Sequence, residues 1–176
     1  AYAQRKAIEY KVANVEFLRM DILQLANLNE KYDLIECSGV LHHMKSPNEG
    51  LAALLEVLKE GGFIKLGLYS DLARLDIVKA RNIISSKNFD SSTEGIRKFR
   101  HNLISGQYSE IQTLHQWSDF YTTSMCRDLC FHVQEHRYSI KQIQKMLNDF
   151  KLNFLGFVLD QYSTLAHKEL YGYRCN

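Results

Sequence analysis

The stretch YDLIECSGVLHHMKSPNEGLAALLEVLKEGGFIKLGLYS, residues 32–70, contains two short apolar runs separated by a helical pattern. The runs YDLIEC (32–37) and FIKLGLY (63–69) have the length and composition of strands. A strand, a helix and a second strand with short links form a crossover unit, which joins parallel strands. This stretch therefore predicts an α/β fold with a parallel sheet.

The segment between the two runs carries local signals for both ends of a helix. Ser46 can accept a hydrogen bond from the backbone N–H of Glu49 while the Glu49 side chain reaches back to Ser46, and Pro47 suits the first helical position. The pair Gly61 and Gly62 is expected to end the helix. One apolar stripe at helical spacing should face a core, formed by Leu51, Leu54, Leu55 and Leu58.

The sequence before residue 32 predicts a further unit of the same kind. Residues 1–11 resemble the end of a helix, and VEFLRM (15–20) resembles a strand. DILQLANLNEK then forms a short connection with helical spacing at Leu25 and Leu28. Two crossover units in succession strengthen the α/β prediction.

Residues 71–136 interrupt this alternation with polar, helical material. We predict a helical insertion or lid there, between core segments at 1–70 and 137–176. Within it, EGIRKFRHNLI carries a basic face, which is either solvated or in contact with a polyanion. Its opposite face is predicted to pack inward through Ile96, Phe99, Leu103 and Ile104.

The α/β pattern resumes after the insertion. Ser139 and Gln142 match a capping box at the start of an amphipathic helix. LNFLGFVL (152–159) then resembles another buried strand.

Composition restricts the class of protein. The chain has 176 residues, 45% of them hydrophobic, which is enough for a sizeable core. A formal net charge of +2 argues against nucleic acid or an anionic membrane as the main partner. No apolar run suggests a membrane span or a signal peptide, so we expect a soluble, cytoplasmic protein.

The cysteines show neither metal-binding nor disulfide spacing, and we interpret Cys37, Cys126, Cys130 and Cys175 as free thiols. Cys126 and Cys130 are one helical turn apart, which favours packing on one helix face over a metal site.

In open parallel sheets, ligands bind outside the carboxyl ends of the strands. Four segments follow predicted strands, namely Asp21 with Ile22, Ser38 to His43, Tyr69 with Ser70, and the tail after residue 159. His42 and His43 also flank a helix start, where the partial positive charge of the helix keeps an imidazole neutral. They are placed either for chemistry or to fill the turn.

Residues 1–70 and 137–160 resemble the second half of the class I S-adenosylmethionine-dependent methyltransferases. The resemblance depends on the DIL after a strand, the "D-L-I" strand closed by "V-L-H-H", the helix, and the Gly-Gly step into FIKLGLYS. RYSIKQIQKMLNDFKLNFLGF is similar to that family's closing helix and "G-F" strand. The resemblance implies a Rossmann-like methyltransferase sheet with a mainly helical insertion.

The resemblance also implies residue roles. S-adenosylmethionine would be the cofactor, with Asp21 and Ile22 at the adenine and the remaining cofactor contacts from Cys37, Ser38, Gly39, Leu41 and His42. A neutral His42 or His43 would suit a general base where the acceptor must lose a proton. The predicted substrate contacts, for a small-molecule or protein methyl acceptor, are His43, Tyr69, Ser70, Trp117, Tyr121 and His132. The aromatic residues of the insertion either wall such a pocket or pack as core.

No glycine-rich cofactor loop of the G-x-G-x-x-G type occurs in the sequence. The chain therefore resembles an N-terminally truncated fragment with an incomplete sheet that lacks its first two strands. We expect weak cofactor binding and self-association into a homo-oligomer through exposed strand edges.

Two other functions remain open. HVQEH (132–136) has the H-x-x-E-H spacing of zinc peptidases, with Glu135 as base and Glu169 as the available third ligand. A non-catalytic binding module with a degenerate methyltransferase fold is the second alternative.

Overall fold

The computed structural model describes residues 2–132, 134–159 and 165. The chain divides into two compact units, Ala1–Arg137 and Tyr138–Asn176, and each is described by itself. The division into 1–70, 71–136 and 137–176 remains a prediction. Cys175, Glu169 and the tail after residue 159, apart from residue 165, lie outside the described residues.

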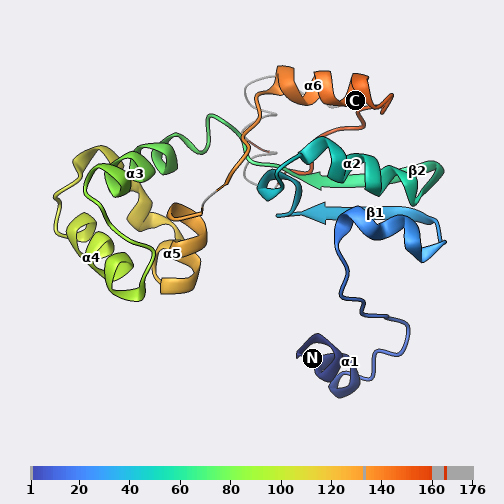
Figure 1. Cartoon of the computed structure of the whole chain (residues 1–176), viewed down its shortest axis with the longest axis horizontal. Helices are drawn as coiled ribbons and strands as arrows, with labels where there is room; N and C mark the ends of the chain where they lie inside the picture. The colour runs from blue at the N-terminus through green and yellow to red at the C-terminus, as the bar shows by residue number, and fades with distance from the viewer. Residues whose placement is uncertain (1, 133, 160–164, 166–176) are drawn as a thin grey trace. The chain divides into compact units, whose positions relative to one another are not determined.

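The first unit contains a parallel pair of strands, β1 (Tyr32–Ser38) and β2 (Leu58–Gly67). Helix α2 (Pro47–Glu56) connects them, which confirms the predicted crossover unit (Figure 1). The register pairs Cys37 with Leu66 and Ser38 with Gly67. Both strands therefore end at the same edge of the sheet, where the predicted site begins. Among the described residues the sheet has two strands, so the larger Rossmann-like sheet stays a prediction.

The start of α2 agrees with the prediction at Ser46 and Pro47, but the predicted return bond from the Glu49 side chain to Ser46 is not among the hydrogen bonds of the described residues, and the end of the helix also differs. Ser46 accepts from the backbone N–H of Glu49 at 3.4 Å and Pro47 is the first helical residue. The helix stops at Glu56, and Leu51 and Leu54 of the predicted stripe are buried, whereas Leu58 lies in β2.

Gly61 and Gly62 lie within β2, so the prediction that they end the helix is wrong. The register shifts between Tyr32, opposite Leu58, and Leu34, opposite Phe63, so β2 contains extra residues at this irregularity. Gly61 lies there with φ +74°, and a Cβ on Gly62 would come within 2.9 Å of the Lys59 carbonyl oxygen. Glycine is required because the chain bends back closely on itself.

The chain before β1 forms α1 (Tyr2–Glu9) and the 3-10 helix η1 (Ile22–Leu28). Both agree with the helical spacing in the sequence. The Asp21 side chain caps η1 by accepting from the Leu23 backbone N–H at 3.0 Å. η1 packs against α2.

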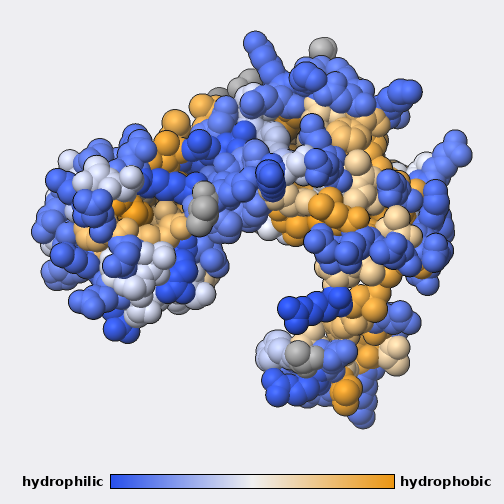
Figure 2. All heavy atoms as spheres, in the orientation of Figure 1, coloured by the Kyte–Doolittle hydropathy of each residue, from blue (hydrophilic) through white to orange (hydrophobic). Residues whose placement is uncertain are grey.

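Two predicted strands are wrong. Residues 15–20 and 152–159, all described, form no strand. Their apolar side chains are exposed, for example Leu18 and Val158, and hydrophobic atoms lie at the surface along the stretch between α1 and β1 in Figure 2. A strand requires a hydrogen-bonded neighbour, and the described part of the chain supplies none to either segment.

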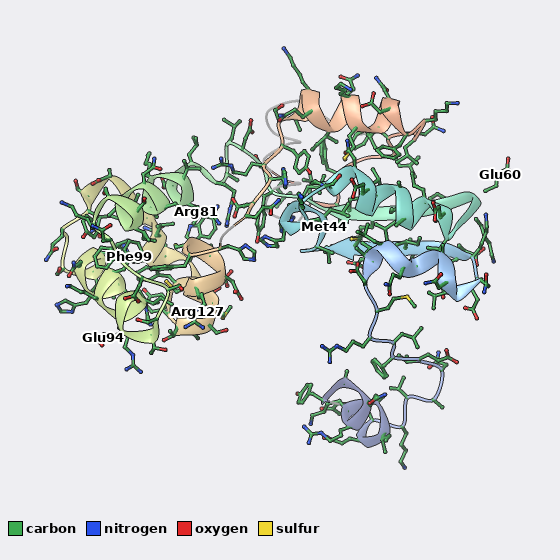
Figure 3. All side chains as sticks on the ribbon, in the orientation of Figure 1. Met44, Glu60, Arg81, Glu94, Phe99 and Arg127 are labelled. Carbon is green, nitrogen blue, oxygen red and sulfur yellow. The ribbon has the colours of Figure 1, made fainter. Side chains whose placement is uncertain are left out.

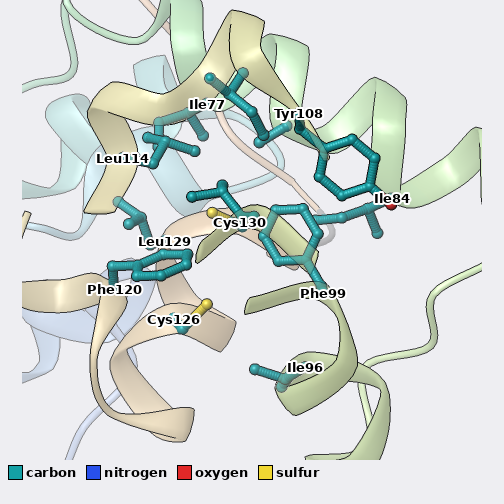
Figure 4. Packing of buried hydrophobic residues seen from close by; sticks show 13 residues of the cluster. Ile77, Ile84, Ile96, Phe99, Tyr108, Leu114, Phe120, Cys126, Leu129 and Cys130 are labelled. Atoms are coloured by element: carbon teal, nitrogen blue, oxygen red, sulfur yellow. The ribbon is translucent and has the colours of Figure 1, made fainter. Parts of the chain in front are cut away.

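The described part of the predicted insertion is mainly helical from Leu75 to Cys130, with short non-helical links. Its elements are α3 (Leu75–Ser86), α4 (Thr93–Ile104), η3 (Ser109–Gln116), η4 (Ser118–Phe120) and α5 (Thr123–Cys130). They enclose a hydrophobic core of their own, in which Phe99 is fully buried (Figure 4). Cys126 and Cys130 share the inward face of α5, as predicted. Ile104 does not join this core, because it is 58% exposed at the helix end.

In the second unit, α6 (Ile140–Asp149) begins with the predicted capping box. The Ser139 side chain accepts from the Gln142 backbone N–H at 3.3 Å, and the Gln142 side chain accepts from the Ser139 backbone N–H at 2.8 Å. Across the described ranges, none of the helices has the length and apolar character needed to span a membrane.

Candidate active site

The turn after β1 is tightly built. Gly39 adopts φ +77°, and the 3-10 helix η2 (Leu41–His43) follows. Leu41 and His42 are each only 1% exposed. The first turn of α2 packs directly on η2, since a Cβ on Gly50 would lie 2.7 Å from the Leu41 side chain. The two histidines are therefore held by the fold at the carboxyl end of β1.

Four rings and one guanidinium form a continuous column beside this turn. Tyr69, two residues after β2, stacks on His42 with ring centroids 3.8 Å apart. His43 contacts His42 edge-on at 4.3 Å and stacks on His132 at 3.9 Å. At the other end, the Arg74 guanidinium lies 4.1 Å from the Tyr69 ring centroid. The column thus joins the two strand ends to the helical region.

The segment after α5 is fastened to the same turn by three hydrogen bonds. The His136 backbone N–H donates to the His42 carbonyl at 2.7 Å. The Gln134 side-chain amide donates to the Met44 carbonyl at 3.0 Å. The backbone carbonyl oxygen of Gln134 lies 3.1 Å from His43 Nδ1. These contacts fix the rim of the site, near the position of Met44 in Figure 3.

The contact at His43 determines its neutral tautomer. A backbone carbonyl can only accept, so the hydrogen bond requires a proton on His43 Nδ1. In the neutral ring, Nε2 then carries the lone pair. His43 therefore presents Nε2 as a proton acceptor.

His42 differs from His43 because it is sealed within the column. Neither of its ring nitrogens has a hydrogen-bond partner among the described residues. Burial lowers the pKa of His42, and the neighbouring His43 lowers it further. His42 is therefore held in its neutral form.

Behind the column lies a buried ion cluster. Glu135 accepts from Arg74 through Nε at 3.2 Å and also through Nη2, and it accepts from Arg81 Nη2 at 3.2 Å. The Glu135 side chain is fully buried, and Arg74 also donates to the Leu129 carbonyl at 3.2 Å. Burial acts to raise the pKa of Glu135, but the Arg74 hydrogen bond and the charges of Arg74 and Arg81 outweigh it and lower the pKa.

The sequence interpretation missed both arginines of this cluster. Arg74 and Glu135 are 61 residues apart, and no spacing rule connects them. The signal that was available was Glu135 itself, within HVQEH, because an acidic residue among histidines suggests a polar site.

The predicted cofactor residues lie as follows. Ser38 ends β1 opposite Gly67, and Cys37 beside it is buried. Burial raises the pKa of the Cys37 thiol, which keeps it protonated. Gly39 has open space where a side chain would stand, and the exposed Asp21 carboxylate begins η1. Small residues beside open space and an exposed carboxylate are suited to contact S-adenosylmethionine.

The predicted substrate residues are only partly brought together. His43, Tyr69 and His132 meet in the column. Ser70 follows Tyr69, and its hydroxyl accepts from the Ala73 backbone N–H at 3.3 Å. Trp117 and Tyr121 belong to the helical region, where the Tyr121 ring lies edge-on to Phe120 at 5.8 Å. Both side chains are exposed, at 37% and 53%, and neither contacts a ring of the column among the described residues.

The zinc interpretation of HVQEH required a helix, and residues 134–136 are not helical. Glu135 is committed to two arginines, which leaves it unsuited to act as a base. Within the described ranges, no group of three or more His, Cys, Asp or Glu side chains is placed to hold a metal ion.

Comparison with known proteins gives a family match over the first part of the chain. Residues 1–64 match the family described as a methyltransferase domain, and this match includes β1, η2 and α2. It supports the resemblance to the class I S-adenosylmethionine-dependent methyltransferases that was predicted from the sequence.

Two relatives extend this result. An uncharacterized protein of Synechococcus sp. is 28% identical over 166 residues, which are 89% of this chain and 40% of that protein. The tRNA U34 carboxymethyltransferase of Helicobacter acinonychis is 41% identical over 80 residues, which are 43% of this chain and 27% of that protein. The chain therefore spans less than half the length of either relative. With the family match, the similarity to the carboxymethyltransferase confirms the predicted methyltransferase resemblance.

Proposed function

We propose that this chain carries the acceptor side of a methyltransferase that uses S-adenosylmethionine and methylates a small molecule or a protein side chain. One observation carries the proposal. The turn with His42 and His43 belongs to the segment that matches a methyltransferase domain, lies at the carboxyl end of β1 and contacts Tyr69 just after β2. In parallel sheets this edge is where ligands bind.

The cofactor would supply a methyl group bonded to a sulfonium. We assign its adenine contacts to Asp21 and Ile22, and the remaining contacts to the turn from Cys37 to His42. The open side of Gly39 allows the backbone to approach a ligand closely. The protein's contribution to displacement at a methyl group is in-line positioning and exclusion of water.

We assign the base to His43 and a positioning role to His42. His43 is half-buried and its Nε2 carries the lone pair in the tautomer set by Gln134. His42 is sealed, so it serves as the floor that holds His43 and Tyr69 in place. An acceptor with a proton to lose would give it to His43 Nε2.

The alternative function is a binding module that retains the fold without catalysis. The histidine turn would then only close the sheet edge, with His42 as a filling residue. The same experiment separates the two functions, because a module transfers no methyl group.

The test is transfer of a radiolabelled methyl group from S-adenosylmethionine. The protein is incubated with fractionated metabolites, with a protein extract and with tRNA, the last because one relative has tRNA in its name. We expect label to enter a small-molecule or protein fraction only slowly, because this chain is predicted to bind the cofactor weakly. His43→Gln should lower the rate at least about a hundredfold if His43 is the base.

His101→Gln is the matched control, since His101 is exposed on α4 and lies outside the column. It should transfer at the rate of the unaltered chain. Label in the tRNA fraction alone would contradict the acceptor class. Absence of label in every fraction, together with retained cofactor binding by calorimetry, would favour the binding module.

A further inference from the structure

Gln134 contacts the histidine turn through both its side chain and its backbone. Its side-chain nitrogen Nε2 lies 3.0 Å from the Met44 carbonyl oxygen and 3.3 Å from His136 Nε2. Its backbone carbonyl oxygen lies 3.1 Å from His43 Nδ1. One residue thus contacts three groups of the site, and each contact restricts where the protons lie.

The contact with Met44 fixes the orientation of the Gln134 amide. A backbone carbonyl oxygen only accepts hydrogen bonds, so the amide atom that faces Met44 must be the nitrogen and not the oxygen. An amide nitrogen carries two hydrogens. One is donated to Met44, and the other is available for His136.

The oriented amide in turn fixes the tautomer of His136. The amide nitrogen cannot accept, so its contact with His136 is a hydrogen bond only when His136 Nε2 carries the lone pair. The proton of the neutral His136 ring is then on Nδ1. A proton on Nε2 would instead set two donors against each other and weaken the hold of the amide on the turn.

The segment is also held at the two positions after Gln134. The Glu135 side chain accepts from Arg74 and Arg81, and the His136 backbone N–H donates to the His42 carbonyl. The amide of Gln134 belongs to the residue whose own carbonyl faces His43. It is therefore the side-chain contact that sets the position of this carbonyl most directly.

We propose that Gln134 is a positioning residue for His43. Its amide holds the residue between the Met44 carbonyl and the neutral His136 ring, and its carbonyl then keeps the proton of His43 on Nδ1. The lone pair of His43 stays on Nε2, the atom assigned above as the base. The catalytic meaning of this arrangement rests on the proposed function, whereas the tautomers of the two histidines do not.

The inference is tested by ¹⁵N nuclear magnetic resonance of the full chain labelled at histidine, at about pH 8, above the ordinary range of histidine titration. The spectrum separates a ring nitrogen that carries a proton from one that carries a lone pair. The variants His43→Gln and His136→Gln assign the two sets of signals. We expect both rings to carry the proton on Nδ1 and the lone pair on Nε2.

Gln134→Glu is the decisive variant, because it keeps the shape of the side chain and replaces the donor by a carboxylate that only accepts. The proton of His136 should move from Nδ1 to Nε2, where it can be donated to the new carboxylate. The signals of His43 should shift to the average of its two tautomers, because its carbonyl partner is released from Met44. A role in packing alone would not reverse the tautomer of one histidine.

Gln134→Leu is the second variant, since it removes the amide without adding a charge. It should also give averaged tautomers at His43, while the near-ultraviolet circular dichroism stays unchanged. Where methyl transfer is measurable, it should lower kcat at least about tenfold and leave the KM for S-adenosylmethionine unchanged. Gln107→Leu is the matched control, because Gln107 is exposed and lies outside the turn, and it should change neither signal.

A proton on Nε2 of neutral His43 or His136 in the unaltered chain would overturn the inference. Unchanged His43 signals in a folded Gln134 variant would do the same.

Failure of this inference differs from failure of the proposed function. Methyl transfer that depends on His43, with His43 signals insensitive to Gln134, would remove the positioning role and leave the function intact. Tautomers that respond to Gln134 without any methyl transfer would retain the contact and remove its catalytic meaning.

Discussion

The imidazole of His42 stacks on the phenol ring of Tyr69 at 3.8 Å, with 26° between the ring planes. One residue lies in the turn after β1 and the other lies beyond β2, so the contact closes the sheet edge. The Arg74 guanidinium lies over Tyr69, 4.1 Å from the ring centroid. A proton on His42 would therefore add a charge to a buried, already basic region.

This arrangement predicts a pH-dependent stability from His42. Its pKa is lowered in the folded chain from an ordinary value of 6.5, so the unfolded chain binds the proton more readily. The free energy of unfolding should fall as the pH decreases below about 6.5, by up to about 1.4 kcal/mol per pH unit. His42→Phe should flatten this dependence in urea unfolding measured from about pH 8 to about pH 5.

The control for that measurement is His101→Phe, which alters an exposed histidine on α4. Its pH profile should follow that of the unaltered chain. Parallel profiles for His42→Phe and the unaltered chain would show that His42 does not titrate in the way its burial implies.

Tyr69 should contribute to stability through two contacts of its ring. Tyr69→Leu removes the stacking on His42 and the cation–π contact with Arg74, at 4.1 Å. We expect a loss of about 1–3 kcal/mol in the free energy of unfolding, measured with urea. Tyr69→Phe keeps the ring and should lose less than about 1 kcal/mol. Equal losses for the two variants would assign the effect to the hydroxyl and not to the ring contacts.

Glu135 should be among the most sensitive positions of the chain. Glu135→Gln leaves Arg74 and Arg81 without their shared carboxylate in a buried setting. We expect a loss of about 3 kcal/mol or more in the free energy of unfolding at neutral pH.

The pH dependence provides a second measurement of Glu135. Its pKa is lowered from 4.5, so its contribution is present above that value and is lost as the pH falls below it. The unaltered chain should lose stability more steeply than Glu135→Gln below about pH 4.5. Glu36→Gln is the control, since its pair with Lys65 is exposed and should contribute less than about 1 kcal/mol. A similar loss for both variants would contradict the importance of burial.

Replacing Gly62 should destabilise the fold because there is no room for a Cβ, and not because of its backbone conformation. A Cβ at this position would meet the carbonyl oxygens of Lys59 at 2.9 Å and Asp33 at 3.0 Å, both of them backbone atoms. Gly62→Ala should therefore cost about 1–3 kcal/mol in urea unfolding. Gly61→Asn is the comparison, because Gly61 has φ +74° with open space around it and asparagine tolerates that conformation. A larger cost for Gly61→Asn would contradict this assignment.

The local sequence was sufficient where the structural signal is local. The helix starts at Ser46 and Ser139 were predicted because a hydroxyl three residues before a backbone N–H can cap it without help from the rest of the chain. The order of β1, α2 and β2 and their parallel pairing also followed, because a short crossover allows few arrangements. The placement of His42 and His43 after β1 was predicted on the same basis.

Tertiary structure decided the features that depend on distant partners. Residues 15–20 and 152–159 have the composition of strands, yet a strand forms only where a neighbour accepts its hydrogen bonds. Gly61 and Gly62 read as a helix end by residue type alone, and only the close approach of Asp33 and Lys59 shows their role in β2. The ion pairs of Arg74 and Arg81 with Glu135 could not be predicted from the sequence either. Charge attraction depends on separation in space and not along the chain.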